Sequence, residues 1–227
     1  MNRQLTIAIA RLIIAALTIL AFPFLLATLR GQEATRPEHW VGTWGTAAVA
    51  RMQPATPAPA NPPSQARPLP AFGNHTLRQI VHTSVGGDRV RVVLSNVFGT
   101  SPLAIGSAHL SLRDKESSIA PASDRALQFS GRSAVTIPTG AVIISDPVAL
   151  SVPAFADLAI DIYVPESTAA GSPLTSHNGA RQTSYLSTPG NHSGETVLPV
   201  ETTISSWVFL ARVEVSAPMN QAAIVAL

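Results

Sequence analysis

Short alternations of apolar and polar residues run along most of the chain after Phe72. In Arg89–Asn96, valine or leucine occupies every second position from Val90 to Leu94, which is typical of a strand with one buried face. Similar segments predict further strands at Trp40–Thr46, Thr76–Val85, Leu103–Arg113, Ala126–Phe129, Ala134–Ile137, Ala141–Ser145, Val148–Val152, Leu158–Val164, Gln182–Ser187 and Ser206–Val215. Prolines separate many of these segments, and no amphipathic helix of useful length lies between them. The sequence therefore predicts an all-β fold, a β-sandwich or jelly roll.

Two local patterns predict details of this fold. The tripeptide Gly86-Gly87-Asp88 joins two predicted strands, and glycine pairs supply the positive φ that hairpin turns need. We therefore expect a hairpin there. Trp40 and Trp44 are four residues apart, which places them on one face of a regular strand and favours shared packing of the two rings.

Residues 1–30 are a hydrophobic leader that we expect to be helical. Arg3 and Arg11 precede a run from Leu12 to Leu29 that is nearly all Leu, Ile, Ala and Phe. Such a run, about 18 residues long, can span a bilayer, and the preceding charge favours export. A cleaved signal peptide and an uncleaved membrane anchor both stay open, because no clear cleavage site follows. Either would place the rest of the chain in the periplasm or outside the cell, in contact with a membrane only through this leader.

The rest of the chain divides into three parts. Residues 31–39 are a polar stalk, and residues 40–216 form the β domain. Within that domain, residues 52–70 are a proline-rich surface loop, since proline lacks the N–H that a central strand needs. Residues 217–227 stand apart because they end in the unbroken apolar run Ala222-Ala-Ile-Val-Ala-Leu227. Such a run is typical of a strand buried on both faces of a parallel sheet, so we expect a stray C-terminal strand there.

Composition excludes several classes of function. The chain of 227 residues has 15 Lys and Arg against 13 Asp and Glu. Arg3, Arg11 and Arg30 belong to the leader, so the remainder carries 12 − 13 = −1 and we expect no nucleic-acid partner. The absence of cysteine excludes disulfides and thiol catalysis. None of the six histidines has the spacing of metal ligands on one strand or helix, so we predict no metal and no other cofactor.

Several motifs together resemble the N-terminal β domain of exported SGNH/GDSL-type hydrolases, which are arylesterase- and acylhydrolase-like enzymes. They are Trp40-Val-Gly-Thr-Trp-Gly-Thr46, Thr76-Leu-Arg-Gln-Ile-Val81, Gly86-Gly-Asp-Arg-Val-Arg91, Leu94-Ser-Asn-Val-Phe-Gly99, Ser123-Asp-Arg-Ala-Leu127, Gln182-Thr-Ser-Tyr185 and Pro189-Gly-Asn-His192. The resemblance covers roughly Trp40 to Leu227 and implies that the parent enzyme hydrolyses carboxylic esters. It also implies that a strand like Ala222–Leu227 leads into Gly-Asp-Ser, whose serine is the nucleophile.

The catalytic blocks that this resemblance implies do not occur in the sequence. The family pattern needs a Ser nucleophile, a Gly and an Asn at the oxyanion site, and an Asp-x-x-His pair, but the chain has no Gly-Asp-Ser and no Asp followed three positions later by His. It also has no Gly-x-Ser-x-Gly elbow, the turn that presents the serine of α/β-hydrolases. We therefore expect no catalytic residue and interpret the chain as a non-catalytic domain, cut off before a catalytic domain that would be its partner. A complete enzyme with an unrecognised site is a further hypothesis, so enzyme activity stays open.

Three residues are candidates for binding. Asn96 opens the turn Asn96-Val-Phe-Gly99, where Asn and Gly are common, and the resemblance suggests that it faces the catalytic domain. His177 lies in the predicted loop Pro165–Asn178, and such loops often carry contacts. Trp44 would either fill the core or stack on a sugar, so the alternative function is a carbohydrate- or surface-binding module with a glycan as partner. A domain without its catalytic partner would expose apolar surface, so we also expect poor solubility or oligomers.

Overall fold

The computed structural model describes residues 38–52, 72–168 and 173–222, and this part of the chain is all-β. It contains no α-helix, and its strands form four antiparallel sheets. The chain divides after Glu38, and the unit from His39 onward contains all of these strands. The predicted all-β class is therefore confirmed.

Two larger sheets make up most of the domain. The five-stranded sheet has the order β1-β16-β4-β10, with β9 also paired to β4. Its strands are β1 (Trp40–Gly45), β4 (Gly87–Ser95), β9 (Val142–Ile144), β10 (Val148–Val152) and β16 (Leu210–Ser216).

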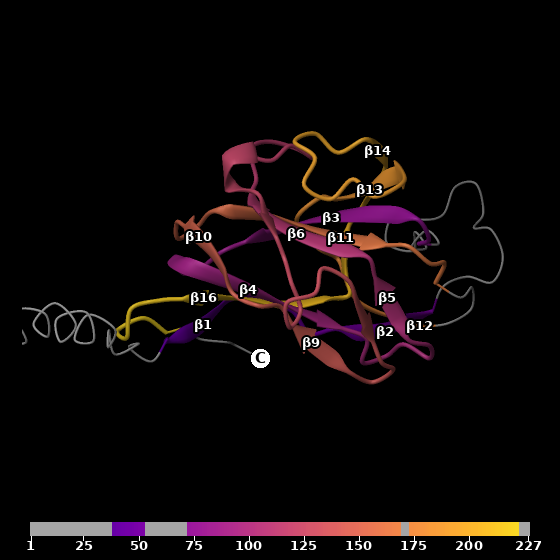
Figure 1. Ribbon diagram of the computed structural model, residues 1–227, viewed down its shortest axis with the longest axis horizontal. Coiled ribbons are helices and arrows are strands. Elements are labelled where there is room, and N and C mark those ends of the chain that lie inside the picture. The colour runs from indigo at the N-terminus through magenta and orange to yellow at the C-terminus, as the bar shows by residue number, and fades with distance from the viewer. Residues whose placement is uncertain (1–37, 53–71, 169–172, 223–227) are drawn as a thin grey trace, which may run out of the picture. The chain divides into compact units, whose positions relative to one another are not determined.

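The six-stranded sheet has the order β14-β13-β3-β11-β6-β7. Its strands are β3 (His75–His82), β6 (Ser107–Leu112), β7 (Arg125–Ala126), β11 (Asp157–Val164), β13 (Ser184–Pro189) and β14 (Val200–Ile204). Figure 1 shows β3, β6 and β11 in one layer, with β1, β4 and β16 in a second layer beneath them. This arrangement is sandwich-like.

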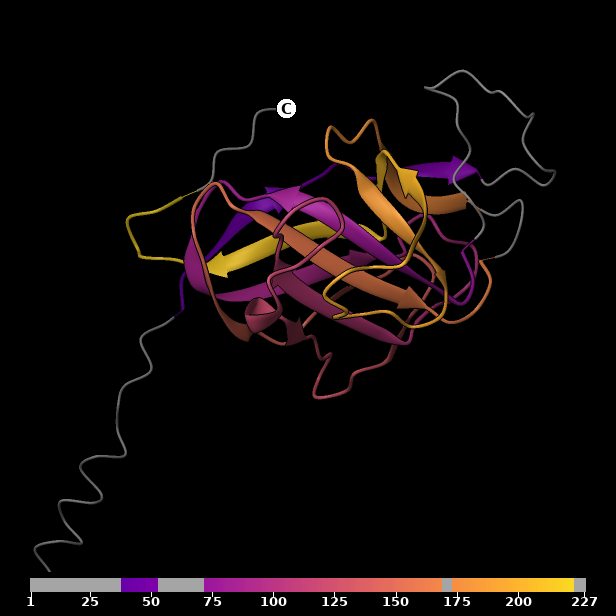
Figure 2. The ribbon, with the colours of Figure 1, turned by 90° about the horizontal axis from the view of Figure 1, so that it is seen from above.

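Two small sheets complete the fold. The three-stranded sheet contains β2 (Val49–Met52), β12 (Pro173–Asn178) and β15 (Ser206–Val208). The two-stranded sheet pairs β5 (Leu103–Ile105) with β8 (Val135–Ile137). Viewed from above, the strands of the two layers cross one another at an angle (Figure 2).

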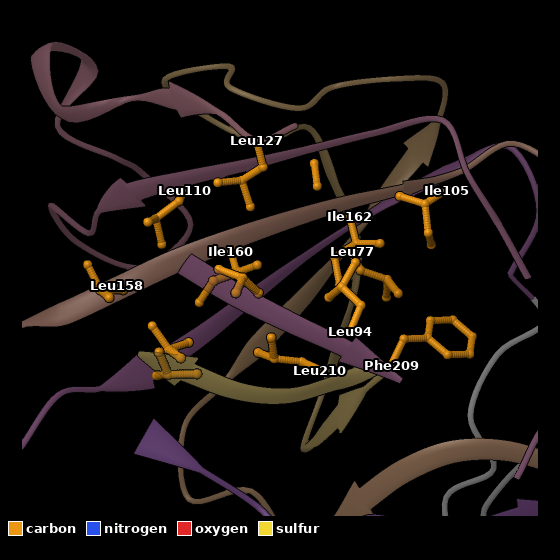
Figure 3. Packing of buried hydrophobic residues seen from close by; sticks show 14 of the residues in the cluster. Leu77, Leu94, Ile105, Leu110, Leu127, Leu158, Ile160, Ile162, Phe209 and Leu210 are labelled. Atoms are coloured by element: carbon orange, nitrogen blue, oxygen red, sulfur yellow. The ribbon is translucent and has the colours of Figure 1, made fainter. Parts of the chain in front are cut away.

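The main hydrophobic core lies between the two larger sheets. Alternate residues of β11, including Leu158, Ile160 and Ile162, are buried there with Leu77 of β3 and Leu94 of β4. Figure 3 shows these side chains pointing toward one another from the two layers. Each buried aliphatic side chain of this kind stabilises the fold by about 1.5–3 kcal/mol. The predicted alternation along β4 is confirmed, because the alternate residues Val90, Val92 and Leu94 are all in this core.

A second, smaller core lies on the opposite face of the six-stranded sheet. It consists of Ile80, Ile119, Ala159, Tyr185 and Leu198. Two connecting segments cover it, residues 113–124 between β6 and β7 and residues 190–199 between β13 and β14, and we call them together the cap. The first cap segment contains the 3-10 turn η2 (Pro121–Ser123). In Figure 1 both segments lie above β3 and β6.

The hairpin predicted at Gly86-Gly87-Asp88 is wrong. β3 belongs to the six-stranded sheet and β4 to the five-stranded sheet, so the tripeptide carries the chain from one layer to the other. Neither glycine has a positive φ. Instead, a Cβ on Gly86 would lie 2.6 Å from the carbonyl oxygen of Val152, and one on Gly87 would collide with the carbonyl oxygen of Ser216. Glycine is needed here because two backbones approach closely.

Trp40 and Trp44 do not share a face, contrary to the prediction. The pairing of β1 with β16 shifts register between Gly42 and Trp44, and a bulge of this kind moves the following side chains to the other face. Trp44 packs against the main core. Trp40 lies on the outer face instead, where the Arg91 guanidinium is 4.2 Å from its ring centre.

Other strands differ from the prediction at their ends or are additional. The predicted strand Leu103–Arg113 is divided at Gly106, where a Cβ would meet the Tyr163 ring at 2.7 Å. The predicted strand Ser206–Val215 is divided at Phe209, which has a φ of 60°. β2, β12 and β14 were not predicted, because β2 has only four residues, β12 begins with proline and is mostly polar, and β14 is mostly polar.

Several sequence-based expectations fall outside the described residues. These are the leader (1–30), most of the stalk (31–37), nearly all of the proline-rich loop (53–70) and the end of the apolar C-terminal run (223–227). None of the described residues belongs to a helix that could span a bilayer.

Candidate functional site

Three charged residues form a row across the outer face of the six-stranded sheet. Antiparallel pairing places Arg78 of β3 opposite Asp161 of β11, and Asp161 opposite His109 of β6. Residues that pair across antiparallel strands point to the same face. The three side chains therefore lie beneath the cap, on the face away from the main core.

Arg78 joins this row to both segments of the cap. Its side chain is fully buried, with 0% exposed, and its Nε and Nη2 each donate to a carboxylate oxygen of Asp161 at 2.7 Å. Nη1 also donates to the carbonyl oxygen of Ser117 at 2.6 Å, and Nη2 to that of Glu195 at 2.8 Å. A buried cation without partners is strongly unfavourable, so the two cap carbonyl oxygens and the Asp161 carboxylate are all needed to satisfy Arg78, and Arg78 in turn holds the cap against the sheet.

Asp124 binds the other end of the row. Its carboxylate accepts hydrogen bonds from His109 Nδ1 and Ser111 Oγ, both at 2.9 Å. Gly194 of the second cap segment lies so close that a Cβ there would be 2.6 Å from His109 Nδ1. The Gly194 N–H donates to Asp161 Oδ2 at 2.9 Å. Both cap segments and three strands therefore meet at one polar cluster.

The contacts within this cluster shift two pKa values in opposite directions. The hydrogen bond to Asp124 raises the pKa of His109 above its usual 6.5, although burial opposes this shift. Burial would raise the pKa of Asp124, but hydrogen bonds from His109 and Ser111 outweigh it and hold that pKa below 3.8. When His109 is protonated and Asp124 is ionised, the positive charges of His109 and Arg78 balance the carboxylates of Asp124 and Asp161.

A serine, an imidazole and a carboxylate thus meet in this cluster, but not in the order of a catalytic triad. In a triad the imidazole lies between the serine and the carboxylate and takes the serine proton. Here the Asp124 carboxylate lies in the middle, and Ser111 donates directly to it. Ser111 is only 2% exposed, and a carboxylate with a lowered pKa is a weak base. The geometry holds the cap in place and provides no activated nucleophile.

Sequence reasoning did not identify this cluster, although two signals were present. Arg78 and Asp161 are each a lone charge within an apolar strand, and charges buried in this way must be paired. The motifs Thr76–Val81 and Ser123–Leu127 contain Arg78 and Asp124. Nothing in the sequence, however, indicates that His109 would lie between Asp161 and Asp124, because that depends on the order of the strands.

The structure places the candidate Asn96 inside a turn. Asn96 is buried, and its Nδ2 lies 3.0 Å from the carbonyl oxygens of both Ser101 and Ile137. A Cβ on Gly99 would overlap its side-chain oxygen. These contacts fix three chain segments relative to one another, so the geometry is that of a structural turn residue.

The candidates His177 and Trp44 both contact Trp207, which lies on β15 of the three-stranded sheet. His177 lies on β12 rather than in the predicted loop, and its ring stacks on Trp207 at 5.8 Å and 30°. Trp44 meets Trp207 edge-on at 5.0 Å. All three side chains are partly exposed. Because two rings already lie against Trp207, part of the surface that a sugar would stack on is occupied.

Comparison with known proteins adds no identification. No model of a known protein family matches the sequence, and a search of curated proteins finds no matching relative.

Within residues 38–52, 72–168 and 173–222, no group of three His, Asp or Glu side chains is placed to hold a metal ion.

Proposed function

We propose that this chain is a non-catalytic β-sandwich or jelly-roll domain of an exported SGNH-type ester hydrolase. In this proposal the hydrophobic leader directs the domain out of the cytoplasm, and the domain supports a separate SGNH catalytic domain in the same or another polypeptide. Ester hydrolysis belongs to that catalytic domain, and the β domain alone does not turn over substrate.

The order of groups in the polar cluster is the observation that carries the non-catalytic part of this proposal. A serine, a histidine and an aspartate lie in contact, but the carboxylate lies between the hydroxyl and the imidazole. Nucleophilic catalysis needs the hydroxyl to face the base and an oxyanion site beside it. The nearby Gly194 N–H, which could otherwise serve as an oxyanion donor, is bound to Asp161.

The motifs that carry the family resemblance supply structural residues of this domain. Arg78 and Asp124 hold the cap, Gly87 permits close contact between backbones, and Asn96 fixes a turn. Such roles suit a supporting domain. They also explain why similar motifs would recur in proteins that share this architecture.

The coding sequence that follows the Leu227 codon in genomic DNA tests the relation to SGNH hydrolases. We expect a Gly-Asp-Ser motif in one of the three reading frames, followed further on by an Asp-x-x-His pair. A downstream sequence without either motif in any frame would contradict the proposed origin.

An esterase assay tests the non-catalytic part separately. We expect the full chain, kept soluble in mild detergent, to hydrolyse an aryl acetate no faster than the heat-denatured chain. Ser111→Ala and His109→Gln variants are the matched controls for the polar cluster, in which a serine, a histidine and an aspartate lie in contact. Hydrolysis by the native chain that either substitution abolishes would overturn the proposal.

A glycan-binding module is the second candidate, favoured by the partly exposed rings of His177 and Trp207 on the three-stranded sheet and of Trp44 on the neighbouring β1. Affinity electrophoresis in gels that contain soluble polysaccharides would detect it. Retardation that Trp44→Ala removes would support glycan binding, with Trp40→Ala on the other face as the control. Equal mobility in all gels would exclude it for those glycans.

A further inference from the structure

We propose that the cap is a pH-responsive clasp, closed while His109 is protonated and loosened when His109 loses its proton. The clasp consists of the two cap segments, residues 113–124 and 190–199, and the row Arg78, Asp161 and His109 beneath them. This inference concerns the β domain itself and does not depend on the proposed relation to ester hydrolases.

The two cap segments depend on each other and on the polar cluster. The Ile119 N–H donates to the carbonyl oxygen of Thr196 at 2.9 Å, which joins one segment to the other. Asp124 anchors the first segment to His109, and Gly194 anchors the second to Asp161. A change at His109 therefore affects both segments, and the apolar contacts beneath them involve only the small second core.

The charges that face His109 come from β3, β11 and the first cap segment. Arg78 on β3 contributes a positive charge, and Asp161 on β11 and Asp124 of the cap contribute negative charges. Glu195 of the second cap segment and Arg125 of β7 lie next to the cluster in sequence or in strand pairing, but their side chains face elsewhere. Glu195 pairs with His192, and Arg125 donates to main-chain oxygens of Ala122, Asp124 and Ala149.

Loss of the His109 proton removes the charge balance of the cluster. With His109 protonated, two positive groups face two carboxylates, and with His109 neutral, one negative charge is left in excess in a poorly solvated place. A neutral imidazole can still donate to Asp124, but without charge the hydrogen bond is weaker. The Asp124 and Asp161 carboxylates then repel each other, and the hydrogen bond from His109 to Asp124 is weaker. Both effects weaken the contact between Asp124 and the sheet, so the cap loosens before the main core does.

His109 is also accessible enough to respond to the solution. Its side chain is 21% exposed, whereas that of Arg78 is not exposed at all. The raised pKa of His109, caused mainly by its hydrogen bond to Asp124, places the transition above pH 6.5. The clasp should therefore be closed in weakly acidic solution and looser in alkaline solution.

Hydrogen–deuterium exchange of the full chain in mild detergent tests this inference. Exchange is measured by mass spectrometry from weakly acidic to weakly alkaline pH, and protection is corrected for the intrinsic pH dependence of exchange. We expect peptides from residues 113–124 and 190–199 to lose about two- to fivefold protection as the pH rises, the range expected for one partly exposed ion pair. Peptides from β4 and β16 should keep their protection.

Two histidine variants make the test specific. His109→Gln should lower the protection of the cap at acidic pH and make it independent of pH. His75→Gln is the matched control, because His75 also contacts a carboxylate on the same sheet, with His75 Nε2 3.5 Å from Glu201 Oε2, and neither residue belongs to the cap. A cap whose protection does not change with pH in the native chain, or changes equally in His109→Gln, would overturn the inference.

Discussion

At the scale of single residues, the buried ion pair of Arg78 and Asp161 links the six-stranded sheet to both cap segments. Asp161→Asn should lower the free energy of unfolding by roughly 3–5 kcal/mol, because it leaves a buried guanidinium without its counter-charge. Urea denaturation of the two chains measures the difference. Asp157→Asn is the matched control on the same strand, and it should cost about 1 kcal/mol or less because its side chain is 29% exposed. Equal losses in both variants would contradict a special role for the Arg78–Asp161 pair.

Single residues were predictable from the sequence where a local rule fixes them. Asn96 before Gly99 predicts a turn, and a turn is what these residues form. The partners of Asp124 were not predictable, because Ser111 and His109 reach it only through the fold of the 113–124 segment. A hydrogen bond between distant residues depends on the arrangement of strands, which the local sequence does not encode.

At the scale of strands, Gly87 at the start of β4 lies directly against the end of β16. Gly87→Ala would push a methyl group into the carbonyl oxygen of Ser216, and backbone can move aside only at a cost. We expect a loss of about 1–3 kcal/mol in the free energy of unfolding, as for other overpacked sites. Gly42→Ala is the control, since the nearest atom to its Cβ would be Arg212 Cδ at 3.9 Å. The interpretation fails if both variants unfold at the same urea concentration.

The positions of most strands could be predicted, but their pairing could not. Apolar alternation marks a strand wherever one face is buried, which is why Val148–Val152 and most of β11 agree with the prediction. The alternation does not say which sheet a strand joins, so the chain from β3 to β4 was interpreted as a hairpin. One bulged residue in β1 was enough to separate Trp40 from Trp44, and no pattern in the sequence marks that bulge.

At the scale of the whole molecule, stability should depend on pH in two directions. The pKa of His109 is raised in the folded protein, so its contribution is present below pH 6.5 and is lost as the pH rises through the raised value. The pKa of Asp124 is lowered, so its contribution is present above pH 3.8 and is lost as the pH falls through the lowered value. We therefore expect the free energy of unfolding, measured by urea denaturation, to be greatest between these two pH values. His109→Gln should remove the decline on the alkaline side, and an unchanged decline would assign it to another group.

The outer face of the five-stranded sheet carries exposed apolar side chains near an open strand edge. On β9, Val142 is 57% and Ile144 is 40% exposed, and Val97 and Phe98, which follow the paired end of β4, are exposed as well. Within the described part of the chain β9 pairs with β4 alone, so exposed apolar side chains adjoin an open strand edge. This combination favours association between copies. We expect residues 31–227 to elute from size-exclusion columns at positions that shift toward larger species as concentration rises.

Replacing both exposed residues of β9 with lysine, Val142→Lys and Ile144→Lys, should shift this equilibrium toward the monomer, because charge at a sheet edge opposes pairing with another strand. The matched control replaces Val197 and Val200 with lysine. These two residues are also exposed but lie in the second cap segment and β14. If the control pair reduces association as much as the β9 pair, general solubility rather than this edge is responsible. A monomer at every concentration in the unsubstituted chain would show that the exposed residues of β9 do not drive self-association.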